Sequence, residues 1–267
     1  MRRLLVASLI ALARTLDRGI TVCTFAAGGL LRFETLGRHR AENWRHFGAS
    51  QAESDVAAGL FGWEQRFYGR FLKTRERVLV VGCGTGRDLL PLLEQGHRAE
   101  GLEPVAVCAE QARERVARTG RSAPIYTADI VTAALTGRYD VVIFSWLCYS
   151  YIPTRTRRIA VLRKVRDHLA PDGRVLISYV LSGSGPRRVT WRLAHLVSRL
   201  TRSDWRPEYG DVFVLWPDTR CIHLEHHFRP AEIEGEAHAA GFEIAFHERG
   251  SDGSIALVPA GAPGPDG

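Results

Sequence analysis

The sequence predicts a doubly wound α/β fold, in which helices cover both faces of a mostly parallel sheet. From residue 77 onward, short apolar runs alternate with helix-like segments, which is typical of βαβ units. The apolar runs are continuous and do not alternate with polar residues, which indicates strands buried on both faces. A chain of 267 residues with 45% hydrophobic and 24% charged residues is long and apolar enough to bury a core of this kind.

The elements of this pattern follow one another in a regular order. The expected strands are residues 78–81, 98–102, 124–128, 139–146 and 174–180, and the expected helices are 88–94, 105–118 and 154–169. The last of these helices ends at Ala-Pro-Asp-Gly (170–173), whose Pro and Gly are helix-stop signals.

The C-terminal part breaks the rhythm. Residues 181–219 are expected to form an insertion over the sheet, with a helix at 187–200. A strand at 221–228, a helix at 230–240 and an antiparallel pair at 242–247 and 255–258 follow. We therefore divide the chain into an N-terminal extension (1–45), a main domain (46–260) and a frayed Pro/Gly-rich tail (261–267).

The N-terminal segment is predicted to form an amphipathic helix. Its continuous apolar run is too short to span a bilayer. Leucines recur at 5, 9, 12 and 16 on one face, and arginines at 3, 14 and 18 lie opposite. The stripe either lies on a membrane surface through residues 1–18 or covers an apolar patch of this protein or a partner, and we favour the packing interpretation. The apolar stretch 19–31 has no clear period.

The formal net charge is +7, and almost all the positive charge is arginine, since Lys73 and Lys164 are the only lysines. Such an excess suits nucleic acid, anionic lipid or an acidic substrate. The densest basic stretch, residues 155–166, is expected to be a solvated helix face. The five cysteines include no CxxC pair, which argues against a disulfide scaffold or a Cys-built zinc site and favours a reducing compartment.

A glycine-rich turn follows the first strand. Gly82, Gly84 and Gly86 alternate with other residues between that strand and a helix. Glycines allow a sharp turn and close approach to a ligand, and a helix N-terminus supplies free N–H donors. In an open α/β sheet, nucleoside-containing ligands bind beyond the carboxyl ends of the strands, so we expect the ligand here.

Two carboxylates follow the next strands. Glu103 comes 17 residues after Gly86, where a carboxylate can accept hydrogen bonds from a ribose diol. Asp129 ends the third strand and can accept from an exocyclic amine. The alternative for either residue is a solvated carboxylate at a strand end.

Five segments in order resemble the class I S-adenosylmethionine-dependent methyltransferases: VLVVGCGTG, GLEP, TADI, YDVVIFSWLCY and LAPDGRVLIS. The resemblance covers about residues 61–258 and implies a seven-stranded sheet whose last strand is antiparallel. It also implies a Rossmann-like fold, the cofactor S-adenosylmethionine and methyl transfer. Residues 226–244 look like the family's sixth strand, last helix and seventh strand.

The resemblance implies roles for ten residues. The loop would hold the methionine end of the cofactor, the second strand end its ribose, the third its adenine, and the fourth would border the methyl group and acceptor. In that order the residues are Gly82, Cys83, Gly84 and Gly86; Glu103 and Pro104; Asp129 and Ile130; Ser145 and Trp146. Segment 61–68 resembles a cofactor-capping helix, in which Trp63 and Tyr68 are contacts or core residues.

One position departs from the family pattern. Many members carry an acidic residue two positions before the first loop glycine, where this chain has Val80. Asp88 is a candidate to replace that carboxylate, and a non-catalytic cofactor-binding partner protein is an alternative interpretation.

Methyl transfer from a sulfonium is an in-line displacement, so alignment supplies most of the acceleration, and a base is needed only for a protonated acceptor. The candidates for such a catalytic group are Tyr149 and His226, and Tyr151, His195, His223 and His227 are also expected near the mouth of the site. No metal is expected, although His223, Glu225 and His227 share one face of a strand.

The expected acceptor is a small organic molecule methylated at oxygen, nitrogen or carbon. RNA or protein are alternative acceptors, and the GxGxG spacing disfavours a nicotinamide or flavin oxidoreductase, which would carry GxGxxG. The aromatic residues of the insertion form either a lid over the acceptor or a buried contact with the sheet: Trp191, Trp205, Tyr209, Phe213 and Trp216.

The cofactor and the cysteines favour a cytoplasmic protein, and residues 1–18 could in addition associate it with a membrane surface.

Overall fold

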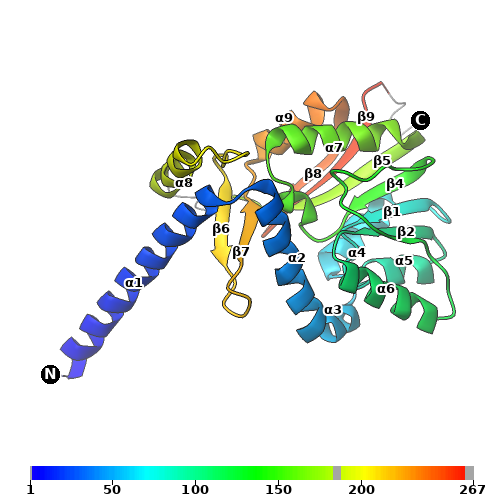
Figure 1. Ribbon diagram of the computed structural model, residues 1–267. Helices are drawn as coiled ribbons and strands as arrows, with labels where there is room; N and C mark the ends of the chain where they lie inside the picture. Colours follow the sequence, from blue (N-terminus) through cyan, green and yellow to red (C-terminus); the bar gives the residue numbers. More distant parts are fainter. Residues whose placement is uncertain (1, 183–187, 262–267) are drawn as a thin grey trace.

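The computed structural model describes residues 2–182 and 188–261. Its centre is a seven-stranded sheet in the order β3-β2-β1-β4-β5-β9-β8 (Figure 1). In that order the strands are Ile125–Thr127, Arg98–Glu103, Arg77–Val81, Tyr139–Phe144, Leu169–Tyr179, Gly253–Pro259 and Phe242–Arg249. The first five run parallel, and β9 is antiparallel to both neighbours. The predicted fold class is confirmed.

Helices cover both faces of the sheet because successive side chains of each strand point to opposite faces. In β1, Leu79 and Val81 pack under α7 (Arg155–Asp167) and α9 (Pro230–Ala239). Val78 and Val80 face α4 (Gly62–Phe71), α5 (Leu89–Glu94) and α6 (Ala106–Arg118). These four side chains are at most 3% exposed, so β1 needs an apolar residue at each of the four positions.

The predicted strand at 221–228 is confirmed as a strand, but its assignment as the sixth strand of the main sheet is wrong. Residues 222–226 form β7 (Ile222–His226), which pairs antiparallel with β6 (Asp211–Leu215) in a separate two-stranded sheet. The last two strands of the main sheet are β8 and β9, the antiparallel pair expected at the C-terminus. A short turn is enough to join antiparallel neighbours, and Gly250–Asp252 supplies it here.

The N-terminal helices and the insertion share a third apolar cluster. The helices of this cluster are α1 (Arg2–Leu30), α2 (Phe33–Ser50) and α8 (Arg188–Leu200), and the short α3 (Ala52–Ala58) follows α2 outside it. Phe25, Trp205 and Phe213 are buried in this cluster. A Cβ on Gly28 would lie 2.5 Å from the Phe213 ring, so the missing side chain lets that ring meet the helix. Two of the five insertion aromatics, Trp205 and Phe213, thus bury the insertion against α1 and α2.

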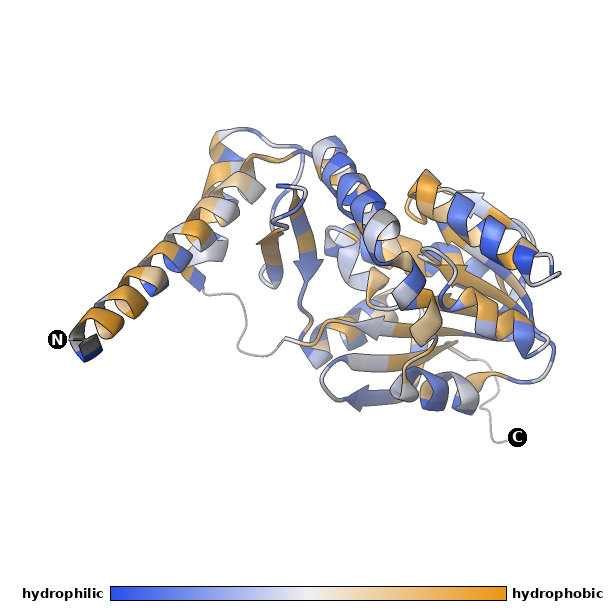
Figure 2. Ribbon diagram, turned by 90° about the horizontal axis from the view of Figure 1, so that it is seen from below, coloured by the Kyte–Doolittle hydropathy of each residue, from blue (hydrophilic) through white to orange (hydrophobic). Residues whose placement is uncertain are grey.

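The leucine stripe of the N-terminal helix does not cover the rest of the chain. Leu5, Leu9, Leu12 and Leu16 are between 55% and 64% exposed, so the favoured packing interpretation is wrong within this chain. Figure 2 shows α1 projecting from the body of the molecule. Among the residues that the structure describes, none of the helices is long and apolar enough to cross a membrane. The predicted tail, apart from Gly261, and residues 183–187 of the insertion lie outside the described residues.

Candidate active site

A cavity opens at the carboxyl ends of the parallel strands. It encloses about 910 Å³, part of it open to solvent. All the cofactor residues predicted from the sequence except Gly86 line it: Gly82, Cys83, Gly84, Glu103, Pro104, Asp129, Ile130, Ser145 and Trp146. The fold therefore brings together residues that the sequence spreads over 65 positions, from 82 to 146.

The glycine loop forms one wall of this cavity. Gly82 (φ +70°) and Gly84 (φ +53°) take left-handed conformations, which glycine adopts at little cost. A Cβ on Gly82 would lie 2.9 Å from Cys148 Cβ, whereas a Cβ on Gly84 would meet no described atom within 4 Å. The backbone at Gly84 is therefore free for close approach by a ligand. Gly86 lies behind the loop, where a Cβ would lie 3.6 Å from Ala112 Cα of α6.

Glu103 stands at the end of β2 and is only 6% exposed. Its carboxylate accepts hydrogen bonds from Gly84 N at 3.0 Å and Val105 N at 2.8 Å. Burial raises the pKa of Glu103 to about 7, and the two backbone donors oppose that rise. The loop and the carboxylate thus hold each other in place at the cavity wall.

Asp129 follows β3 and forms an ion pair with Arg40 of α2. Its other oxygen accepts a hydrogen bond from Val131 N at 2.9 Å. Arg40, Trp44 and Phe47 all line the cavity, so α2 covers it as a wall that the sequence analysis did not assign. Their spacing of four and three residues places them on one face of α2. This periodicity in the sequence could have predicted that one face of the helix is covered by other parts of the protein.

A buried polar cluster closes the far end of the cavity. The Arg87 guanidinium is 4% exposed and lies 2.6 Å from Glu64 and 2.7 Å from Asp88. Asp88 in turn accepts hydrogen bonds from Tyr68 Oη at 3.0 Å and Ser145 Oγ at 2.8 Å. Tyr68 therefore serves this cluster and does not line the cavity. Two cavity-lining groups in it, Arg87 Nη1 and Thr85 Oγ1, have no hydrogen-bond partner in the described part of the chain.

Neither predicted catalytic residue lies in the cavity lining. Tyr149 is fully buried and donates to Glu236 at 2.9 Å, and burial followed by the nearby Glu236 charge raises its pKa. His226 is 1% exposed and lies 2.7 Å from Asp211 and 3.2 Å from Glu232. Both side chains are used to join buried elements. The structure instead places Tyr151 in the lining, two residues after Tyr149 at the end of the 3-10 turn η1 (Cys148–Tyr151).

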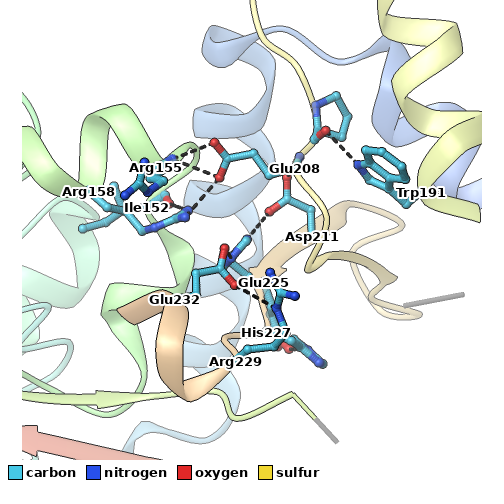
Figure 3. Close-up of polar contacts among 12 residues, drawn as sticks. Ile152, Arg155, Arg158, Trp191, Glu208, Asp211, Glu225, His227, Arg229 and Glu232 are labelled. Atoms are coloured by element: carbon cyan, nitrogen blue, oxygen red, sulfur yellow. Dashed lines mark hydrogen bonds and ion pairs between the residues drawn. The ribbon is translucent and has the colours of Figure 1, made fainter. Parts of the chain in front are cut away.

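A polar network fastens the insertion to the main domain, and Figure 3 shows its members Arg158, Glu208 and Asp211. Arg158 of α7 is fully buried and lies 2.7 Å from Glu236 of α9 and 3.0 Å from Glu208, just before β6. The expectation that the basic stretch 155–166 is solvated is therefore wrong at Arg158. Lys164 departs from it too, because its ammonium donates to the carbonyl oxygens of residues 130, 131 and 133.

His226 should make the stability of this junction depend on pH. Burial by itself would lower the pKa of His226, but its hydrogen bonds to Asp211 and Glu232 raise it to about 8 from 6.5. The protonated ring thus stabilises the folded chain by about 2 kcal/mol, in full below pH about 6.5, and this is lost as pH rises through about 8. Chemical denaturation across that range should show the loss in the wild type.

Two variants isolate the contribution of His226. The loss should be absent in His226→Asn and retained in His238→Asn, which changes an exposed histidine of α9. Equal pH dependence in the wild type and His226→Asn would contradict the assignment.

A second cavity of about 650 Å³ adjoins the first and shares Arg40, Asp129 and Tyr151 with it. Phe33 and Leu36 of α2 and Leu224 of β7 form apolar walls. His223 also lines this second cavity, and its ring centroid lies 4.7 Å from that of Tyr151. Among the described residues no hydrogen bond is found for the Tyr151 hydroxyl.

The comparisons with known proteins agree with this geometry. A family model described as a methyltransferase domain matches residues 26–245. No curated protein matches the sequence.

Several solved structures share the fold. One is an S-adenosylmethionine-dependent methyltransferase from Methanosarcina mazei (TM-score 0.59, 18% identity, covering 76% of this chain and 99% of that one). A second is DhpI in complex with S-adenosylhomocysteine (TM-score 0.60, 18% identity, covering 85% of this chain and 98% of that one). A third is a 1,6-didemethyltoxoflavin N1-methyltransferase from Burkholderia thailandensis (TM-score 0.58, 18% identity, covering 84% of this chain and 89% of that one).

Proposed function

We propose that this chain, which belongs to the family of class I S-adenosylmethionine-dependent methyltransferases, transfers a methyl group to a small organic acceptor. The observation that carries the proposal is one cavity in which the bare backbone at Gly84, the Glu103 carboxylate and the Arg87 guanidinium lie together. Bound S-adenosylmethionine supplies an activated methyl group, and the residues described next hold and orient the reactants.

The cavity-lining groups fit the cofactor. Arg87 Nη1 and Thr85 Oγ1 are polar atoms without a protein partner among the described residues, and they suit the amino-acid end of this ligand. Asp88 lies beside Arg87 but is fully buried and does not line the cavity, so it does not replace the carboxylate missing at Val80 in the lining. Glu103 is set to accept ribose hydroxyls, and Asp129 to accept the adenine amine once it is released from Arg40 or shared with it.

The second cavity is the proposed acceptor chamber, because it meets the cofactor cavity at Tyr151. Burial raises the pKa of the Tyr151 phenol, so the hydroxyl stays protonated at neutral pH. It is therefore suited to donating a hydrogen bond that orients the acceptor and is unsuited to removing a proton. In-line transfer then depends on alignment of the acceptor atom with the methyl group.

Arg157 gives this chamber a preference for an acceptor with an anionic group. Its guanidinium lies 3.4 Å from the centre of the Phe33 ring and has no carboxylate partner within the described ranges. A guanidinium backed by an aromatic face binds carboxylate or phosphate while the ring covers the apolar part of the ligand. One structural neighbour is named for 1,6-didemethyltoxoflavin and another for a glycopeptide, and a chamber of about 650 Å³ suits a small molecule better than a glycopeptide.

The test combines binding and turnover. Isothermal titration with S-adenosylhomocysteine should show binding, and mass spectrometry should find methylated products among small aromatic acids and phosphates. Arg157→Gln should raise KM for such acceptors about tenfold or more with little change in kcat, and Arg155→Gln, an exposed neighbour on α7, should leave both unchanged. If S-adenosylhomocysteine does not bind at millimolar concentration, the proposed function is wrong. If the protein methylates RNA in a salt-dependent way, the proposed small-molecule acceptor is wrong.

Glu103 should make cofactor binding depend on pH. Only its ionised form accepts both ribose hydroxyls, and its pKa is raised to about 7, so affinity should increase with pH up to about 7 and then level off. Below that pH the affinity for S-adenosylhomocysteine should fall by up to about tenfold per pH unit. Titrations of Glu103→Gln should give weaker binding with no such slope, and a slope that survives in this variant would assign the dependence to another group.

A further inference from the structure

Within residues 2–182 and 188–261, most of the N-terminal helix α1 is not covered by any other part of the protein. Every residue from 5 to 23 is exposed, and Figure 1 shows this part extending away from the sheet. Its C-terminal end is anchored on α8, where a Cβ on Gly29 would lie 2.3 Å from Ala194 O, so the two helix backbones meet. This part of α1 exposes large apolar side chains at positions 5, 6, 9, 10, 12, 16, 20 and 22, and a contiguous exposed apolar surface marks a contact site.

The apolar face of α1 points away from the anchored side. At 100° per residue, Leu5, Leu9, Leu12, Leu16 and Ile20 fall within one narrow arc, and each is between 55% and 64% exposed. The buried residues at the anchored end, Thr24, Phe25, Gly28 and Gly29, lie on the other side of the helix. The stripe is therefore presented outward for its whole length.

The helix α8 repeats the same pattern. Val189, Leu196 and Leu200 are 75%, 53% and 74% exposed, and with Leu193 they follow the spacing i, i+4, i+7 and i+11. Exposed arginines at 188, 192 and 199 lie beside this stripe on the helix circumference. Two crossing helices thus expose apolar stripes, and the stripe of α8 is bordered by positive charge.

The charge of these helices identifies the surface that covers them. Together α1 and α8 contain seven arginines and one aspartate. A second copy of the chain would bring like charges together, whereas an anionic bilayer offers both an apolar layer for the leucines and phosphates for the arginines. None of the described helices is apolar enough to cross a membrane, so the contact is with the surface. We infer that α1 and α8 dock the protein on the surface of an anionic lipid bilayer.

Vesicle flotation of the full chain tests this inference. The protein should float with vesicles of phosphatidylcholine and phosphatidylglycerol, should bind pure phosphatidylcholine far less, and should be released by added salt. Leu9→Glu/Leu16→Glu should lower binding at least about tenfold. The matched control Ala7→Glu/Ala11→Glu adds the same charges on the arginine face of α1 and should lower binding no more than about threefold.

Three outcomes would overturn the inference: no flotation with either vesicle, equal binding to neutral vesicles, or dimers in sedimentation velocity that the leucine variant dissociates. Far-UV circular dichroism and the thermal unfolding midpoint confirm that each variant is folded, since the changed positions of α1 are exposed. The inference does not depend on the proposed methyl transfer, so either can fail without the other.

Discussion

Gly84→Asn is expected to weaken cofactor binding by at least about a hundredfold while the chain stays folded. The backbone at Gly84 is left-handed (φ +53°) and lines the cavity, and a Cβ there would project into open space. Asparagine tolerates this conformation better than most residues, so the side chain should occupy ligand space without breaking the loop. Titration with S-adenosylhomocysteine measures the loss.

The matched control for this variant is Gly120→Asn. Gly120 is exposed, has φ +70° and also has open space around its Cβ position, but it does not line the cavity. It should bind the cofactor as the wild type does. Wild-type affinity in Gly84→Asn would show that the ligand binds elsewhere, and a loss in both variants would point to an effect on folding.

Arg158→Met should lower the free energy of unfolding by about 3–5 kcal/mol, because it leaves a buried carboxylate without its partner. Glu236 is fully buried, with Arg158 2.7 Å away and the Tyr149 hydroxyl as its other donor. Methionine fills a similar space with no charge, so the effect measures the unpaired carboxylate more than a cavity. Chemical denaturation gives the difference.

Two further variants show whether the charge is the cause. Arg155→Met, on the exposed side of α7, should change stability by less than about 0.5 kcal/mol. Adding Glu236→Leu to Arg158→Met should restore part of the loss, since no buried charge then remains unpaired. A double variant less stable than the single one would assign the effect to packing.

The main sheet and the cavity were predictable because their signals are local. The buried runs that become β1 and β4 read as strands from their composition alone, and the glycine turn follows β1 directly. Since parallel strands end at the same edge of a sheet, Glu103 and Asp129 had to approach that turn. Knowing the order of the elements was therefore enough to bring these residues into one cavity.

The misassigned strand shows where local signals end. Residues 222–226 have strand-like composition and precede a helix, as a sixth strand of the main sheet would. Their partner, β6, is only six residues away, across the turn formed by residues 216–221. What local sequence does not encode is the sheet that this hairpin joins, because the hairpin packs with α1 and α2 and does not extend the main sheet. The same limit applies to Tyr149 and Tyr151, which are two residues apart but face a buried carboxylate and a cavity, respectively.

The fold class, the glycine loop with its carboxylates, and the amphipathic character of the N-terminal helix could all be predicted, because each follows from residues near one another in the chain. Tertiary structure alone decided that Arg158 is buried, that Arg40 and Tyr151 enter the site, and that the leucine stripe of α1 stays exposed. Burial and charge pairing depend on which distant segments meet, and those meetings are set by the packing of the whole chain.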